Sequence, residues 1–177
     1  MNTSSHDLKS PSDWVVRWAD RVPAHGRVLD LACGSGRHAR YFAARGCVVE
    51  AVDRDAAALA SLQGIAGVTT RCADLEGGPW LYEDRFFSAI VVTNYLYRPL
   101  FPHLVAGLAP QGTLIYETFA LGNERYGRPS NPDFLLKPGE LLEAVLGRLR
   151  VVAYEDRYVA EPKPAQIQRI CAVQEVK

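Results

Sequence analysis

The chain has 177 residues, of which 48% are hydrophobic and 23% charged, and its 20 basic residues balance its 20 acidic residues. This length suits one domain with a sizeable core, so we expect a single domain over residues 1–177 with an N-terminal segment over 1–26. Because the chain is neutral and has no apolar run suited to a signal peptide or a membrane span, we expect a cytoplasmic protein without nucleic acid or membrane partners; its oligomeric state stays open.

The first half of the chain alternates between strand-like and helical patterns. Ser10-Pro11-Ser12-Asp13 supplies helix-start chemistry ahead of Trp14, Val15 and Trp18, which are spaced for one helical face, so a short N-terminal helix is expected. The elements predicted after it are a strand over 27–32, a helix over 36–45, a strand over 47–53, a helix over 55–63 and a strand over 67–72. This order is typical of βαβ units that build a parallel sheet.

The second half continues the alternation and ends differently. The predicted elements are a strand over 86–93, a helix near 99–108, a strand over 112–119, a loop over 120–136, a helix over 138–147, and strands over 149–159 and 166–174. The strand from 86 to 93 has the continuous apolar core of a buried central strand. The last two strands are separated by Glu161-Pro162-Lys163-Pro164, which favours an antiparallel hairpin.

The four cysteines are scattered along the chain, at Cys33, Cys47, Cys72 and Cys171. No pair forms a CxxC motif, and no histidine lies at the spacing of a zinc ligand. We therefore predict free, mostly buried thiols and no metal site.

The most informative segment is a buried strand that leads through a glycine turn into a helix, from Val28 to Ala39. Glycines in such a turn let the backbone approach a ligand closely, because no Cβ stands in the way. Gly34-x-Gly36-x-x-Ala39 also fits the relaxed dinucleotide fingerprint, so this loop alone leaves NAD open as the ligand.

Asp30 lies four residues before the first glycine of that turn. A pyrophosphate would be repelled by a carboxylate there, whereas a ligand that carries a sulfonium and an ammonium would be attracted. The charge therefore favours S-adenosylmethionine over NAD. The alternative is that Asp30 accepts hydrogen bonds from amides of the loop.

Two further carboxylates follow the next two predicted strands. Asp53 ends the second strand and is placed to accept hydrogen bonds from the hydroxyls of a ribose; the alternative is a helix cap, for which Asp55 is better placed. Asp74 follows the third strand, where it and the next residues would contact an adenine ring, unless it only stabilises the turn before Gly77. Ligands of open α/β sheets bind at this edge, where the carboxyl ends of the strands meet.

With these residues in place, the chain resembles a class I S-adenosylmethionine-dependent methyltransferase over about residues 27–177. Asp30-Leu31-Ala32-Cys33-Gly34-Ser35-Gly36 is similar to the glycine-rich first motif of the family, and Asp53 and Asp74-Leu75 stand where the family has its ribose and adenine contacts. The resemblance implies an α/β fold, a Rossmann-like three-layer sandwich with a seven-stranded, mostly parallel sheet whose last strand is antiparallel. It also implies S-adenosylmethionine as cofactor, with contacts from Asp30, Leu31, Ala32, Cys33, Gly34, Gly36, Asp53, Arg54, Asp74, Leu75 and Asn94.

The run Thr93-Asn94-Tyr95-Leu96-Tyr97 occupies the position of the family's fourth motif, where the methyl group and its acceptor meet. It departs from the Asn/Asp-Pro-Pro-aromatic form that many nucleic-acid and protein methyltransferases use. It resembles instead the small-molecule and tellurite-resistance-like branches of bacterial methyltransferases. The resemblance therefore implies a small-molecule acceptor.

Methyl transfer is an in-line displacement from a good leaving group, so orientation can supply much of the acceleration and a general base is optional. Tyr95, Tyr97 and Glu117 are the candidate catalytic residues, and His103 is a further candidate base. The loop from Leu121 to Leu136 carries cationic and aromatic residues that could close over an acceptor, or it is a surface connection.

Two other functions remain open at the level of sequence. One is a NAD-dependent oxidoreductase, which a larger thermal shift with NAD than with S-adenosylhomocysteine would favour. The other is a noncatalytic S-adenosylmethionine-binding protein of the same fold, which would bind cofactor and turn over no acceptor.

Overall fold

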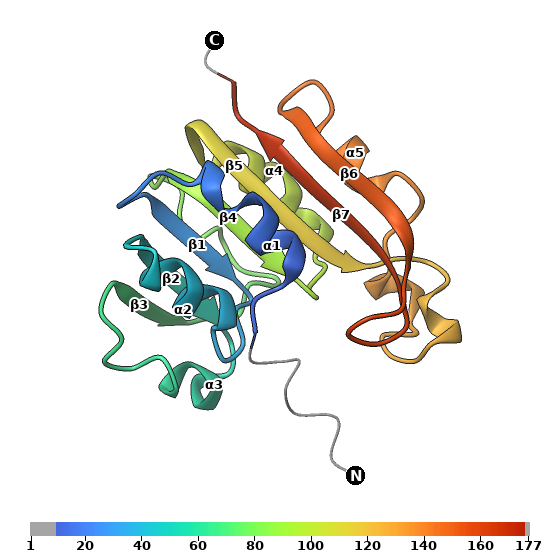
Figure 1. Cartoon of the computed structure of the whole chain (residues 1–177), viewed down its shortest axis with the longest axis horizontal. Helices are drawn as coiled ribbons and strands as arrows, with labels where there is room; N and C mark the ends of the chain where they lie inside the picture. The colour runs from blue at the N-terminus through green and yellow to red at the C-terminus, as the bar shows by residue number, and fades with distance from the viewer. Residues whose placement is uncertain (1–9, 176–177) are drawn as a thin grey trace.

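The computed structural model describes residues 10–175, which form one seven-stranded sheet with strand order β3-β2-β1-β4-β5-β7-β6 (Figure 1). Its strands are β1 (Arg27–Leu31), β2 (Val48–Asp53), β3 (Val68–Cys72), β4 (Phe87–Thr93), β5 (Leu108–Phe119), β6 (Arg150–Val159) and β7 (Ala165–Val173). Strands β1 to β5 pair in parallel, and β7 is antiparallel to both β5 and β6. The predicted fold class and the closing hairpin are confirmed. Part of the predicted segment over 1–26, residues 1–9, lies outside the described residues.

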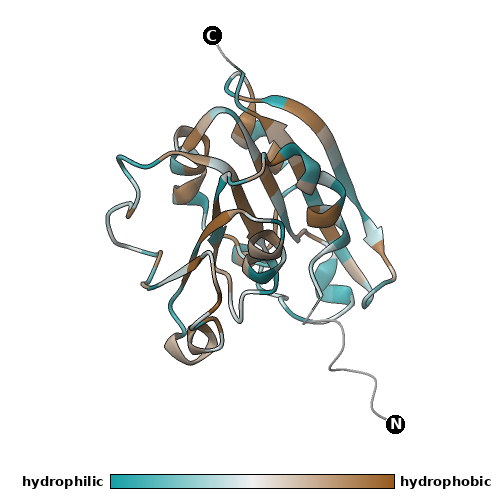
Figure 2. Ribbon diagram, turned by 60° about the vertical axis from the view of Figure 1, so that its left-hand side comes forward, coloured by the Kyte–Doolittle hydropathy of each residue, from teal (hydrophilic) through white to brown (hydrophobic). Residues whose placement is uncertain are grey.

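Helices cover both faces of the sheet and complete three layers. Helices α1 (Asp13–Trp18), α2 (Arg37–Ala44) and α3 (Ala56–Ala60) pack on one face, and α4 (Phe101–Ala106) and α5 (Glu140–Val145) pack on the other. The layers follow from the alternation of side chains in strands, which sends Val28 to the first face and Leu29 to the second. Figure 2 shows the apolar central strands enclosed between these helices.

Two of the helices begin at the residues that the sequence indicates. Ser12 Oγ accepts a hydrogen bond from the Trp14 amide at 3.1 Å and caps α1. Asp55 Oδ1 accepts from the amides of Ala57 and Ala58 and caps α3, which leaves Asp53 available for another role. Of the helices among residues 10–175, none is long and apolar enough to cross a bilayer.

The helix predicted near 99–108 is shorter than expected, and the following strand is longer. A 3₁₀ turn over Arg98–Leu100 precedes α4, and the chain enters β5 at Leu108 instead of residue 112. The Gly107 amide closes the helix on the His103 carbonyl at 2.8 Å, and the Gly107 carbonyl then accepts from the Phe87 amide at 2.9 Å. Pairing with β4 therefore starts immediately after the helix ends, which no local pattern in the sequence reveals.

The predicted thiols are present as free cysteines. Cys33, Cys47 and Cys171 are buried in the core on the side of α1, α2 and α3, whereas Cys72 at the end of β3 is exposed. Burial raises the pKa of Cys171 to about 11, so its thiol is protonated at neutral pH.

Candidate active site

A cavity of about 320 Å³ opens where the carboxyl ends of β1 to β5 meet, and we call it the inner cavity. Its volume lies at the lower end of the roughly 300–1,000 Å³ that small-molecule and cofactor sites occupy. It is lined by Ala32, Asp53, Arg54, Ala73, Asp74, Leu75, Glu76, Asn94, Tyr95, Leu96, Thr118, Phe119, Pro129 and Phe134. The polar residues predicted after separate strands are thus brought together at one edge of the sheet.

The turn between β1 and α2 depends on residues in the left-handed region. Ala32 has φ 53°, Gly34 has φ 54° and Gly36 has φ 74°. A Cβ at Gly36 would overlap the side chain of the buried Leu62, which follows α3, so a glycine suits both this close approach and the positive φ. A Cβ at Gly34 would meet no described atom within 4 Å, which leaves open space beside the backbone at that glycine.

Asp53 connects this turn to the end of β2. Its Oδ2 accepts from the Gly34 amide at 2.7 Å and its Oδ1 accepts from the Asp55 amide at 2.9 Å. A carboxylate has about four acceptor positions, so two remain for a ligand on the side that lines the inner cavity. The predicted position of Asp53 at a ligand-binding edge agrees with this geometry.

Asp30 does not line the inner cavity. Its side chain is buried beneath the turn, and its Oδ2 accepts a hydrogen bond from the Ala39 amide at 2.9 Å. Burial raises the pKa of Asp30 to about 7, against the opposing effect of that hydrogen bond. The alternative interpretation of Asp30, as an acceptor for backbone amides, therefore describes its contact, and the expected direct attraction of a cationic ligand has no geometric support.

Several other residues of the first motif that were predicted to contact the cofactor also do not line the inner cavity. Leu31 is buried in the core on the side of α4 and α5, and Cys33 is buried in the opposite core. Gly34 and Gly36 shape the turn without being among the residues that line the cavity. In this segment, Ala32 is the residue whose side chain reaches it.

The segment after β3 contributes a polar wall. Asp74 and Leu75 line the inner cavity as predicted, and Asp74 Oδ1 also accepts from the Glu76 amide at 3.0 Å, which is the expected turn contact. Glu76, which was not predicted, lines the cavity too. Glu76 lies two residues after Asp74 on the same loop, and this closeness in sequence could have indicated that both carboxylates line one cavity.

The segment after β4 supplies Asn94 and Tyr95. Asn94 has φ 56°, and both residues line the inner cavity. The Tyr95 hydroxyl donates to Glu76 Oε1 at 3.4 Å, and its pKa is raised by burial and by the nearby Glu76 carboxylate. The Tyr116 hydroxyl donates to the Tyr95 carbonyl at 2.8 Å, which fixes the backbone at this point.

Two of the three catalytic candidates lie elsewhere. The Tyr97 hydroxyl accepts from the Gly77 amide at 3.2 Å and is not among the residues that line the cavity. Glu117 is on the opposite face of β5, where its carboxylate accepts from Ser12 Oγ at 2.7 Å and pairs with Arg169 at 3.1 Å. Because neighbouring side chains in a strand point to opposite faces, Thr118 lines the cavity where Glu117 was expected.

His38 of α2 is buried. Its Nε2 accepts from the Ser12 amide at 3.1 Å, which joins the start of α1 to α2. Burial, with a contribution from the Arg37 charge, lowers the pKa of His38 to about 3, so the ring is neutral and suited to accept this hydrogen bond.

A second, more open cleft of about 510 Å³ adjoins the inner cavity, and we call it the outer cleft. The two share Asn94, Phe119, Pro129 and Phe134. The outer cleft is lined by Asn94, Phe119, Arg128, Pro129, Ser130, Asn131, Phe134 and Lys163. The loop over 121–136, predicted either to close over an acceptor or to be a plain connection, thus forms a wall of both spaces.

The geometry by itself defines the class of binding site. A mostly parallel sheet, a glycine turn after the first strand, and acidic residues after the second and third strands together form a cofactor site of the Rossmann-like type. The comparisons with known proteins make this assignment more specific. A family model described as a methyltransferase domain matches residues 28–112, the span that holds β1 to β4 and the start of β5.

Solved structures support the fold across nearly the whole chain. TehB from Haemophilus influenzae superposes with a TM-score of 0.77 at 18% identity, over 93% of this chain and 63% of that one. The N-methyltransferase NodS from Bradyrhizobium japonicum gives 0.70 at 16% identity, over 92% and 93% of the two chains. Coclaurine N-methyltransferase, solved with N-methylheliamine and S-adenosylhomocysteine, gives 0.62 at 16% identity, over 81% and 50%. A search of curated proteins found no match.

Residues 28–112 therefore match a methyltransferase domain, and the chain has the fold of class I S-adenosylmethionine-dependent methyltransferases. The fold agrees with the TehB-like branch that the sequence resembles, and the chain spans less than two thirds of the length of the TehB structure. The match to a methyltransferase domain does not favour the NAD-dependent alternative.

Proposed function

We propose that the enzyme transfers the methyl group of S-adenosylmethionine to a small-molecule acceptor by in-line displacement, within one domain. The observation that carries this proposal is that two spaces adjoin: the inner cavity, with its acidic wall, shares Asn94 and Phe119 with the outer cleft. Two of the structures with the same fold are N-methyltransferases by name, and one of them was solved with N-methylheliamine, which supports a small-molecule acceptor.

The residues of the inner cavity suit S-adenosylmethionine. Asp53 has acceptor capacity left for a pair of ribose hydroxyls, and Asp74 can accept from an exocyclic amine while Leu75 offers an apolar surface to a ring. The open space beside Gly34 admits a ligand close to the backbone. Arg54 lies on the same wall and is exposed, which suits a polar contact at the rim.

When bound, the cofactor supplies an electrophilic methyl carbon on a sulfonium, whose displacement releases a neutral thioether. The protein residues then have to hold two partners in line and exclude water from between them. Asn94 and Phe119, which border both spaces, are placed to define that line. Asp30 holds the glycine turn in position from below through its contact with Ala39.

Among residues 10–175, the four that border both spaces are Asn94, Phe119, Pro129 and Phe134, and none of them is a base. Tyr95 is the catalytic candidate that lines the inner cavity, and its raised pKa keeps the hydroxyl protonated at neutral pH. Glu117 is turned away and paired with Arg169, and Tyr97 is bound to the Gly77 amide. We therefore assign no proton transfer to these residues, and we infer an acceptor that reacts as a nucleophile without prior loss of a proton to the protein.

Calorimetry with S-adenosylhomocysteine tests the cofactor site. Asp53→Ala removes the acceptor for the ribose and should weaken binding by about 1–3 kcal/mol, since a buried polar pair loses its partner. Asp55→Ala is the matched control, because it removes the α3 cap and lowers stability without touching the cavity. Equal affinity of Asp53→Ala and the wild type would remove Asp53 from the site. Tighter binding of NAD than of S-adenosylhomocysteine would overturn the proposed function.

A further inference from the structure

The outer cleft lies where two distant segments meet. The loop after β5 supplies Arg128 to Asn131, and the turn between β6 and β7 supplies Lys163. Figure 1 shows this turn beside the loop, and Lys163 Nζ lies 5.9 Å from the centre of the Phe119 ring at the end of β5. The cleft is thus framed by one cation from each segment.

Both cations lack a carboxylate partner among the described residues. Some arginines near the loop are paired, such as Arg98 with Glu140 at 2.6 Å and Arg169 with Glu155 at 2.7 Å. For Arg128 and Lys163, no carboxylate oxygen within residues 10–175 lies inside 4.0 Å. Their positive charge is therefore available to a ligand in the cleft.

The two adjoining spaces have opposite charge. The inner cavity carries three carboxylates and one cation, from Asp53, Asp74, Glu76 and Arg54, and is acidic on balance. The outer cleft is lined by Arg128 and Lys163 and by no acidic residue among those that the structure describes. A positively charged cofactor is suited to the first space, and a negatively charged acceptor to the second. Their shared wall brings the two charges toward one another, which favours the encounter of a sulfonium and an anion.

The apolar part of the outer cleft is aromatic. Phe134 is 50% exposed, and Phe119 forms the shared wall beside Lys163. An exposed aromatic next to unpaired cations suits a ligand that presents a flat apolar group together with an anionic one.

The frame of the cleft is held by hydrogen bonds from Asn123 and Arg98. Asn123 is buried, its Nδ2 donates to the Pro129 carbonyl at 2.9 Å, and its Oδ1 accepts from the Gln166 amide at 3.3 Å. On the other side, Arg98 Nη1 donates to the Asp133 carbonyl at 2.7 Å. These contacts position the loop against both β7 and the start of α4.

We propose that the outer cleft binds the methyl acceptor through a carboxylate or phosphate group held by Arg128 and Lys163, with its ring on Phe119 and Phe134. The substrate class is thus a small aromatic or similarly flat anion. This inference deepens the proposed function and rests on it.

Titration of three ring compounds against protein saturated with S-adenosylhomocysteine tests the proposal: benzoate, phenyl phosphate and the neutral analogue benzamide. Ligand-observed NMR gives the Kd of each. We expect at least one anion to bind about tenfold more tightly than benzamide, as charge-assisted hydrogen bonds require. The double variant Arg128→Gln/Lys163→Gln should reduce this preference to less than about threefold.

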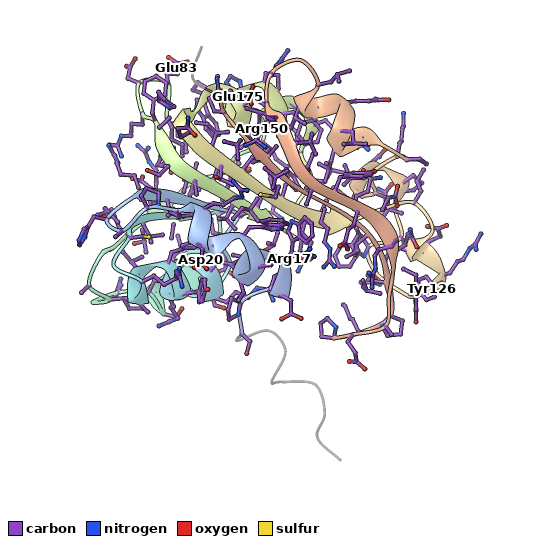
Figure 3. All side chains as sticks on the ribbon, turned by 45° about the horizontal axis from the view of Figure 1, so that its top comes forward. Arg17, Asp20, Glu83, Tyr126, Arg150 and Glu175 are labelled. Atoms are coloured by element: carbon purple, nitrogen blue, oxygen red, sulfur yellow. The ribbon has the colours of Figure 1, made fainter. Side chains whose placement is uncertain are left out.

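Arg148→Gln is the matched control, since Arg148 is an exposed arginine next to the start of β6. Figure 3 shows Arg150 and Glu175 at the end of the molecule opposite Tyr126, which precedes the cleft residues in the loop. Arg150 forms an ion pair with Glu175 at 2.9 Å and lies two residues after Arg148. The control should keep the full preference. Arg128→Lys/Lys163→Arg, which preserves the charges, should keep most of it.

The proposal is overturned if benzoate, phenyl phosphate and benzamide bind alike, if neither anion binds at millimolar concentration, or if the double variant keeps the preference. Comparison of benzoate with phenyl phosphate tells which anion the cleft prefers. Binding of S-adenosylhomocysteine is measured separately in the wild type and in each variant. If the wild type does not bind S-adenosylhomocysteine, the proposed function is contradicted. If the wild type binds it but shows no preference for an anion over benzamide, this inference alone is contradicted.

Discussion

Asp30 carries the most perturbed carboxylate of the candidate site, and its chemistry is set by burial. Its pKa rises from 3.8 to about 7 because the charged form loses its hydration beneath the glycine turn. The folded chain therefore binds one more proton than the unfolded chain between about pH 4 and 7. The stability associated with protonated Asp30 is complete below pH 4 and declines as the pH rises to 7.

Asp30→Asn should remove this pH dependence. The amide oxygen can still accept the Ala39 hydrogen bond, and no charge has to be buried. We expect the variant to gain stability relative to the wild type between pH 5 and 8, by at most about 2–3 kcal/mol. Urea unfolding at both pH values measures the difference. A variant whose stability relative to the wild type is the same at pH 5 and 8 would show that Asp30 is not the titrating group.

Some residues of the candidate site could be placed at the cavity from the sequence, and others could not. Asp53, Asp74 and Asn94 could be placed at the cavity because each follows a strand, and the ends of parallel strands meet at one edge. Asp30 and Glu117 could not, because their contacts depend on which face of the strand they occupy and on what packs there. Glu117 is neutralised by Arg169, a residue that lies 52 positions away in the sequence.

At the scale of elements, the order of strands and helices was readable from hydrophobic alternation, and the limits of α4 and β5 were not. The start of β5 is determined by pairing with β4 at Phe87, a contact between distant segments. The same applies to the loop over 120–136. It contains two 3₁₀ turns, and the Leu136 amide donates to the Phe119 carbonyl at 3.0 Å, so the loop returns to the end of the strand that it leaves.

Arg98 holds this loop in place. Its guanidinium donates to Glu140 at 2.6 and 3.0 Å and to the carbonyl of Leu135 at 2.9 Å. Burial by itself would raise the pKa of Glu140, yet hydrogen bonds from Arg98 and the Lys137 amide lower it overall. The ion pair is partly buried and connects the start of α4 to the start of α5, so its loss affects both elements that border the loop.

Arg98→Gln should destabilise the loop more than the rest of the sheet. We expect a loss of about 1–3 kcal/mol, between the values for exposed and buried pairs, because the Arg98 side chain is 35% exposed. Hydrogen exchange at the Leu136 amide should accelerate, while exchange in β1 stays slow. Arg85→Gln, which breaks an exposed pair with Glu50, is the control. Equal exchange at Leu136 in all three proteins would contradict this role of Arg98.

On the scale of the whole molecule, the sheet separates two cores, and the first helix closes one of them against the last strand. Trp14 of α1 is buried, its Nε1 donates to the Ile170 carbonyl of β7 at 3.2 Å, and the Arg169 guanidinium lies 4.7 Å from its ring centre. Ser12 adds contacts to His38 and Glu117. Since these contacts join opposite ends of the described chain, they form only when the whole sheet is assembled.

Trp14→Ala should therefore destabilise the entire fold and not α1 alone. Removing a buried tryptophan leaves a cavity and removes the Nε1 hydrogen bond to the Ile170 carbonyl, which together cost about 3–5 kcal/mol. Val16→Ala on the same helix, where Val16 is 42% exposed, should change stability by less than about 0.5 kcal/mol. Far-UV circular dichroism during urea unfolding measures both. A single transition at lower urea in Trp14→Ala is expected, because α1 packs on the same core as α2 and the central strands. If Trp14→Ala instead kept the wild-type urea midpoint and lost only a small helical signal, α1 would not contribute to the stability of the sheet. The stability of the C-terminal edge of the sheet would then have to come from the hairpin of β6 and β7.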